Sequence, residues 1–153
     1  MRTRGWTLVL ISALAACGAA DAAEQPDGIE QAVRACELLS LADATRIIGP
    51  GTEHPGGDTE EWTCIYSNPG VALLTVQLGP AASYDEIMIP QPHAALDVGA
   101  RGRYNTQDNG VAAVQFVSGD YAVTLGARPI GSTDTDLLDP LMAAAREIAS
   151  ALQ

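Results

Sequence analysis

The amino-acid sequence predicts an α+β domain: a mostly antiparallel sheet of about five strands with helices packed on it, in the order α-β-β-α-β-β-β-α. Two pairs of alternating apolar segments joined by short turns are typical of β-hairpins. A capped apolar stripe before the first pair and apolar residues at helical spacing near the C-terminus indicate flanking helices. Hydrophobic residues make up 47% of the 153 residues, which is enough for one buried core.

The first elements are expected to be helical. Ile29–Ala35 can start a short helix, and Ser40 is the expected N-cap of the next helix, with Asp43 facing the free amides of its first turn. Gly49 followed by Pro50 ends this helix. Its predicted apolar stripe consists of Leu41, Ala44, Ile47 and Ile48.

A first hairpin follows, with its turn at 68–70. A three-residue loop there places six apolar residues on one face of the two strands. The pairs in that register are Tyr66–Ala72, Cys64–Leu74 and Trp62–Val76. A two-residue loop would place Leu73, Thr75 and Gln77 opposite the first strand. These residues are less apolar as a set, so we favour the three-residue loop.

The middle of the chain is less regular. Ser83 and Glu86 match a capping box and predict a short helix over Tyr84–Ile89, which Pro90 ends. An irregular strand is expected within Leu96–Tyr104.

The last elements carry clear signals. Val111–Ser118 and Tyr121–Ala127 form a predicted hairpin whose two-residue turn places Phe116 opposite Val123 and Val114 opposite Leu125. A C-terminal helix is predicted from the spacing of Leu138, Leu141, Ala145, Ile148 and Leu152, with Pro140 in its first turn.

The N-terminal residues are typical of a bacterial lipoprotein signal peptide. Arg2 and Arg4 precede the apolar run Trp6–Ala16, which is too short to span a bilayer. The run ends in Leu-Ala-Ala before Cys17, a pattern that looks like a lipobox, in which the cysteine thiol receives the lipid. We therefore expect a signal peptide at 1–16, a lipidated Cys17 with a flexible tether at 17–28, and one domain at 29–153. Ordinary secretion with cleavage after Ala22 is the alternative.

This leader predicts a place outside the cytoplasm, on the periplasmic side of a bacterial membrane or at the cell surface. Cys36 and Cys64 are then disulfide candidates. Closing a loop of about 29 residues stabilises a fold by about 3.6 kcal/mol in the chain-entropy model. Metal binding by the two cysteines is the alternative; it needs further soft ligands, and His54 is the one on offer.

The charge of the chain limits its partners. The net charge is −11, and loss of the two leader arginines takes it to −13. Such a surface repels phosphates and anionic headgroups, so nucleic-acid binding and polybasic membrane docking are disfavoured. The lipid anchor is the expected membrane contact, a protein or envelope component is the expected partner, and a cationic partner stays possible. No cofactor is expected.

Two segments carry a family resemblance. Cys36-Glu37-Leu38-Leu39-Ser40 at a helix start, and Trp62-x-Cys64-x-Tyr66 at the start of a hairpin, resemble small exported bacterial lipoproteins with a domain of unknown function. Gly99-Ala100-Arg101-Gly102 looks like the glycine-rich strand entry of these proteins. The resemblance covers roughly Cys36–Leu152, implies a compact domain similar to the PsbP-like fold, and carries no catalytic residues.

Candidate sites are few. The sequence contains no nucleophile elbow, zinc motif, Cys-x-x-Cys pair or phosphate-binding loop. An acidic loop is a weak candidate for Ca²⁺, which prefers oxygen ligands; it holds Glu53, His54, Asp58, Glu60 and Glu61. A proline-rich segment with Met88, Ile89 and His93 is a candidate for partner recognition. Arg101 and Arg103 are candidates for holding an anion, against pairing with nearby acids.

The sequence thus favours a non-enzymatic, lipid-anchored binding module outside the cytoplasm. One alternative is a small-ligand carrier with a pocket between sheet and helices, lined by Trp62, Tyr66 and Val76. A second alternative is an unrecognised hydrolase, in which two acids such as Glu60 and Glu61 converge in a cleft.

Overall fold

The structure is a computed structural model that describes residues 33–54, 62–87, 89–131 and 136–153. It contains the helices α1 (Leu41–Ile48) and α2 (Leu138–Ala151) and the 3-10 turns η1 (Ala35–Glu37) and η2 (Ala81–Asp85). The strands are β1 (Thr63–Asn68), β2 (Ala72–Pro80), β3 (Ala94–Ala95), β4 (Arg101–Thr106), β5 (Ala112–Ser118) and β6 (Tyr121–Pro129). The predicted leader, Cys17 and the tether lie outside the described residues. Among the helices described, none has the length and apolar character needed to cross a membrane.

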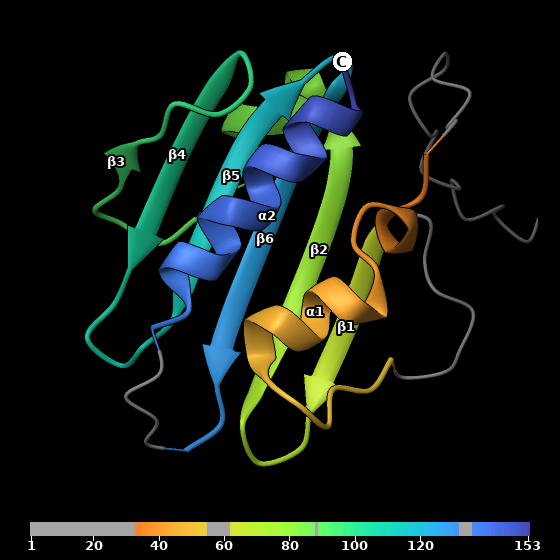
Figure 1. Cartoon of the computed structure of the whole chain (residues 1–153). Helices are drawn as coiled ribbons and strands as arrows, with labels where there is room; N and C mark the ends of the chain where they lie inside the picture. Colours follow the sequence, from red (N-terminus) through yellow and green to blue (C-terminus); the bar gives the residue numbers. More distant parts are fainter. Residues whose placement is uncertain (1–32, 55–61, 88, 132–135) are drawn as a thin grey trace, which may run out of the picture.

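The fold is α+β, as predicted. The sheet has six strands in the order β1-β2-β6-β5-β4-β3, and neighbouring strands run antiparallel. Figure 1 shows α1 and α2 on the same face of this sheet, with α1 over β1 and β2 and α2 over β5 and β6. The core lies between the two layers; its largest fully buried side chains include Tyr66, Phe116, Ile48, Leu74, Leu125 and Leu141.

The hairpin of β5 and β6 has the predicted register, with Phe116 opposite Val123 and Val114 opposite Leu125. Its two-residue turn contains Gly119, whose φ of 54° lies in the left-handed region that glycine tolerates. This prediction succeeded because turn and apolar alternation, both local signals, agree.

The predicted register of β1 and β2 is wrong by two residues. Tyr66 pairs with Leu74 and Cys64 with Val76, so the loop begins after Asn68 rather than at it. Asn68 stays in the strand because its side chain is bonded to the end of α1. A shift of two residues keeps every side chain on its predicted face, so Cys64, Tyr66 and Leu74 all point into the core.

Helix α1 begins at the predicted cap. The Asp43 amide donates to Ser40 Oγ (3.1 Å), and the Ser40 amide donates to Asp43 Oδ2 (3.2 Å). Hydrogen bonds from Ser40 and from the Arg46 guanidinium lower the pKa of Asp43. Leu41 is the wrong member of the predicted stripe: it is 47% exposed at the first residue of the helix, whereas the other three are buried.

Helix α2 follows its predicted pattern. Leu141, Ala145 and Ile148 are buried against the sheet, and the Ser118 hydroxyl of β5 donates to the carbonyl of Ala149 (2.8 Å). Pro140 occupies the first turn, where a missing amide proton costs no helical hydrogen bond.

The middle of the chain follows the prediction in part. The predicted helix over Tyr84–Ile89 is wrong: it is instead the earlier 3-10 turn η2, because Ser83 Oγ donates back to the carbonyl of Pro80 (2.7 Å) and caps nothing. The strand predicted within 96–104 is found at 101–104 as the start of β4, and a bend at 96–100 joins it to the short strand β3. The Leu96 amide closes this bend by donating to the Gly102 carbonyl (3.0 Å).

Strand β1 is linked to the N-terminal helical segment at every second residue. Cys64 is disulfide-bonded to Cys36, and the Tyr66 hydroxyl donates to the Leu39 carbonyl. Asn68 Nδ2 donates to the carbonyl of Ile48 at the end of α1 (2.6 Å). We call these three contacts the β1 links; they fix the segment 35–49 on one face of the sheet.

Removing the third β1 link should destabilise the fold. Asn68→Ala leaves the buried carbonyl of Ile48 without its donor, so we expect the free energy of unfolding to fall by about 2 kcal/mol. Urea denaturation measures this change. Gln77→Ala on the exposed side of β2 is the control, and equal urea midpoints for the two variants would contradict the assignment.

Candidate functional sites

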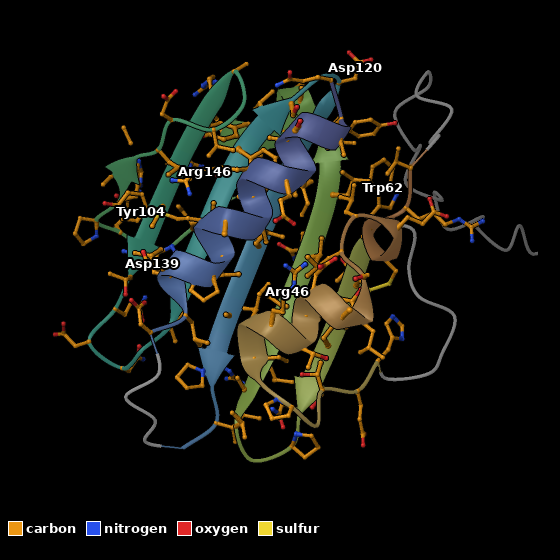
Figure 2. The ribbon with its side chains drawn as sticks, in the orientation of Figure 1. Arg46, Trp62, Tyr104, Asp120, Asp139 and Arg146 are labelled. Carbon is orange, nitrogen blue, oxygen red and sulfur yellow. A yellow bond between two sulfur atoms is a disulfide. The ribbon has the colours of Figure 1, made fainter. Side chains whose placement is uncertain are left out.

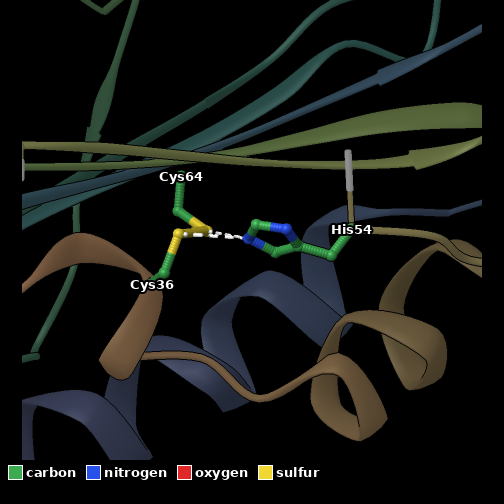
Figure 3. Close-up of side chains that lie close together, drawn as sticks. All are labelled: Cys36, His54 and Cys64. Atoms are coloured by element: carbon green, nitrogen blue, oxygen red, sulfur yellow. Dashed lines mark hydrogen bonds between the residues drawn. A yellow bond between two sulfur atoms is a disulfide. The ribbon is translucent and has the colours of Figure 1, made fainter. Parts of the chain in front are cut away.

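The disulfide is in contact with a histidine. Cys36 in η1 and Cys64 in β1 are joined, with their Cα atoms 5.0 Å apart. His54 Nε2 lies 3.2 Å from Cys36 Sγ and 3.3 Å from Cys64 Sγ (Figure 3). We call these three residues the sulfur–histidine cluster. The imidazole nitrogen faces the two sulfur atoms almost symmetrically.

The histidine is held in this orientation from two sides. The neighbouring Glu53 forms a bridge with Ser67 of β1, in which each amide donates to the other carbonyl (2.7 and 2.9 Å). The edge of the His54 ring packs against Tyr66, with ring centroids 5.3 Å apart and planes at 82°. His54 is thereby fixed by the sheet edge and by a core aromatic side chain.

The predicted acidic loop gains no support as a calcium site. Asp58, Glu60 and Glu61 lie outside the described residues. Glu53 is exposed and takes part through its backbone, and His54 turns toward the disulfide. Within the described residues, the His54 ring lies against the two sulfur atoms and the Tyr66 ring. Its relation to Asp58, Glu60 and Glu61 stays a prediction.

The two candidate arginines meet over one aromatic ring. The guanidinium carbons of Arg101 and Arg103 lie 4.4 and 4.6 Å from the ring centroid of Tyr84, which is buried in η2. Arg101 also donates to both carboxylate oxygens of Asp85 (2.9 and 3.2 Å), and this hydrogen bonding lowers the pKa of Asp85. Burial raises the pKa of Tyr84.

Arg103 is built into the interior of this region. Its Nε donates to Gln115 Oε1 (2.6 Å), and its Nη2 donates to the carbonyls of Tyr84 and Ile87 (3.0 Å each). Gln115 is fully buried, and its amide nitrogen donates to the same two carbonyls (3.2 and 3.1 Å). These bonds hold η2 on the sheet, a role that the sequence did not reveal because Gln115 lies in an otherwise apolar strand.

Arg101 pairs with the nearby Asp85, which was the alternative to an anion site, and Arg103 supports η2. The candidate recognition segment also changes. Ile89 is 4% exposed, so its place on a recognition surface is wrong, since it packs inward beside η2. His93 is exposed and lies beside Gln91, with 2.6 Å between Nδ1 and the amide nitrogen. Met88 lies outside the described residues.

The second face of the sheet is partly uncovered. The turn η2 packs on β2, β5 and β6 at one end of that face. Beyond it, strand residues that point away from the helices line a hollow of about 350 Å³. We call this area the open patch; it consists of Leu73, Thr75, Ala113, Gly126 and Arg128, which line the hollow, and of the exposed Ile65, which is paired with Thr75.

The open patch is apolar and nearly uncharged. Ile65 is 42% exposed, and Val71 and Ile130, at the ends of the same strands, are 36% and 37% exposed. These are three of the four exposed large hydrophobic side chains in the described parts of the chain. No atom lies within 4 Å of the position that a Cβ on Gly126 would take, so the middle of the patch is hollow. Arg128 is its one charged side chain, in a chain of net charge −11.

A smaller hollow of about 210 Å³ separates α1 from α2. Its floor includes Ile47 and Ala144, and the ion pair of Arg46 with Asp43 lies at its rim beside Glu147 (Figure 2). The charged groups of Arg46 and Asp43 already neutralise each other, so this hollow offers an incoming ligand less than the open patch.

The pocket expected of a ligand carrier is filled at the predicted positions. Tyr66 and Val76 are 2% and 0% exposed and belong to the core, with Trp62 packed against it. They face neighbouring core side chains, which leaves the carrier hypothesis without its predicted lining. Comparison with known protein families, curated proteins and solved structures finds no match to this chain.

Replacing Arg103 should loosen η2. Arg103→Met keeps the apolar stem and removes the donors to Gln115, Tyr84 and Ile87, so the free energy of unfolding should fall by about 2 kcal/mol. Arg101→Met, at the exposed ion pair, is the matched control and should cost clearly less. Thermal or urea unfolding measures both; an equal or larger loss for the Arg101 variant would refute the structural role of Arg103.

Proposed function

We propose that this protein is a lipid-anchored binding module that works outside the cytoplasm and binds a protein partner through the open patch. The observation that carries the proposal is the patch itself: an apolar, hollowed area on a sheet face that helices leave uncovered, on an otherwise acidic chain. Contiguous apolar patches that are exposed on a protein surface mark interaction sites.

The place of action is inferred from the N-terminal sequence. The arginines, the short apolar run and the lipobox ending at Cys17 support export and lipidation. A disulfide between Cys36 and Cys64 suits an oxidising compartment. The resemblance to small exported lipoproteins supports the same location, and a PsbP-like fold stays part of this proposal.

The chemistry of the patch defines the partner. Its row of Ile65, Thr75, Gly126 and Ala113 crosses four neighbouring strands and offers a shallow apolar floor. Arg128 beside Leu73 offers one positive charge at the rim. We therefore expect a protein surface with an apolar side chain that enters the hollow and a carboxylate that pairs with Arg128. The acidic remainder of the chain disfavours anionic partners that lack this apolar contact.

The proposed anchor is tested by the mass of the N-terminus. We expect the native protein, extracted from the cell envelope, to begin at Cys17 and to carry the mass of two or three acyl chains. Cys17→Ser should abolish the acyl mass and release the protein from the membrane fraction. An unmodified N-terminus at Ala23 would show ordinary secretion instead and would remove the anchor from the proposal.

The proposed binding surface is tested by filling its hollow. A photo-crosslinking residue at Thr75 should give one defined adduct in the envelope, and Gly126→Phe or Arg128→Glu should abolish that adduct by occupying the floor or reversing the rim charge. Ser150→Phe, on the exposed side of α2, is the matched control. An adduct that persists in the Gly126 and Arg128 variants, or is lost equally in the control, counts against the patch.

A further inference from the structure

Three potential metal-binding atoms come together at one point of the fold. Cys36 Sγ, Cys64 Sγ and His54 Nε2 all lie within 4.8 Å of one another (Figure 3). They come from η1, from β1 and from the segment between α1 and β1 that is bridged to Ser67. Two sulfur atoms and one imidazole nitrogen form a donor set that soft metal ions prefer.

We propose that, once the Cys36–Cys64 disulfide is reduced, this sulfur–histidine cluster binds one thiophilic d10 metal ion, Cu(I) or Zn(II), and that the oxidised form does not. Metal binding at the cluster is thereby switched by the redox state of the cysteine pair.

The distances already approach those of a metal site. With metal–sulfur bonds of about 2.3 Å and metal–nitrogen bonds of about 2.0 Å, tetrahedral ligands place nitrogen about 3.5 Å from each sulfur. The observed distances are 3.2 and 3.3 Å. The two sulfurs must separate from bonding distance to about 3.8 Å. Reduction itself causes this separation, because it removes the bond between them.

The position of the histidine needs an explanation beyond the disulfide. Disulfide sulfur is at best a weak hydrogen-bond acceptor, so a structural disulfide gains little from an imidazole nitrogen placed between its two atoms. His54 is nevertheless oriented by a backbone bridge and by the Tyr66 ring. Such support is typical of metal-binding histidines, whose orientation is fixed by neighbouring groups.

The redox step balances with a dithiol as reductant. A thiolate of the dithiol attacks Cys36 Sγ, the less buried sulfur, and its second thiol completes the exchange, so two electrons pass to the protein and the dithiol becomes a disulfide. The metal ion then displaces the two thiol protons, and the neutral His54 ring binds through its Nε2 lone pair while Nδ1 keeps the proton. Zn(II) would take water as a fourth ligand, whereas softer Cu(I) favours the two thiolates.

This inference does not depend on the proposed partner surface. Cys64 and Tyr66 face the helices, whereas the open patch lies on the opposite face of the sheet. A variant of the cluster therefore leaves the patch intact, and a variant of the patch leaves the cluster intact. The two proposals succeed or fail separately.

The test compares oxidised and reduced protein in a Cys17→Ser background, in which the third cysteine offers no thiol. The protein is reduced anaerobically with a phosphine, which is then removed by desalting because phosphines bind Cu(I). Native mass spectrometry after addition of Cu(I) or Zn(II) then gives the stoichiometry. We expect one ion per reduced chain and none per oxidised chain. Co(II) as a spectroscopic probe should give a thiolate charge-transfer band, and the metal should raise the unfolding temperature of the reduced protein.

The histidine is tested with a matched pair. His54→Ala should weaken metal binding by about tenfold or more, and His93→Ala, at the other and exposed histidine, should leave it unchanged. If the reduced protein is unfolded without metal, the ion should refold it, as for other sites in which binding and folding are coupled. Absence of a bound ion in the reduced wild type, equal binding by the oxidised form, or no difference between the two histidine variants would overturn the proposal.

Discussion

The β1 links are the interactions on which the rest of the arrangement depends. Helix α1 has eight residues, too few to be stable by itself in water. Three contacts from alternate residues of β1, namely a disulfide, a tyrosine hydroxyl and an asparagine amide, hold the segment 35–49 against the sheet. Since alternate residues of a strand share a face, all three act on the same side. They place the segment 35–49 on that face, so the opposite face is covered by other elements, among them η2.

One end of the opposite face is covered by η2, which polar contacts hold on the sheet. Arg103 and the fully buried Gln115 together satisfy the carbonyls of Tyr84 and Ile87, so η2 is held down by hydrogen bonds where a larger element would be held by apolar contact. A turn of five residues cannot extend far along the strands. The division of this face into a covered end and an open patch therefore follows from the shortness of η2.

The parts of the fold that were predictable from sequence are those with local signals. The Ser40 cap, the Gly119-Asp120 turn and the spacing of α2 each lie within a few residues, and each is found where expected. The first hairpin was placed two residues out because a distant contact, from Asn68 to Ile48, decides where its loop begins. The role of Arg103 depends on residues of η2 and β5, so no pattern around Arg103 alone reveals it. The open patch could not be predicted from sequence, because it depends on the shortness of η2.

The convergence of His54 on the two cysteines has the same non-local origin, and it bears on how the cluster behaves without its disulfide. When the sulfur–sulfur bond is absent, the other two β1 links still join Tyr66 to Leu39 and Asn68 to Ile48. Leu39 is three residues from Cys36, and Tyr66 is two residues from Cys64, so the two thiols stay at high effective concentration relative to each other. Glu53, the neighbour of His54, is bridged to Ser67 of the same strand independently of either sulfur. The contacts that support the disulfide therefore also keep the three donor atoms together after the sulfur–sulfur bond is broken. Because the ligands are preorganised in this way, assembling a coordination site costs little further entropy.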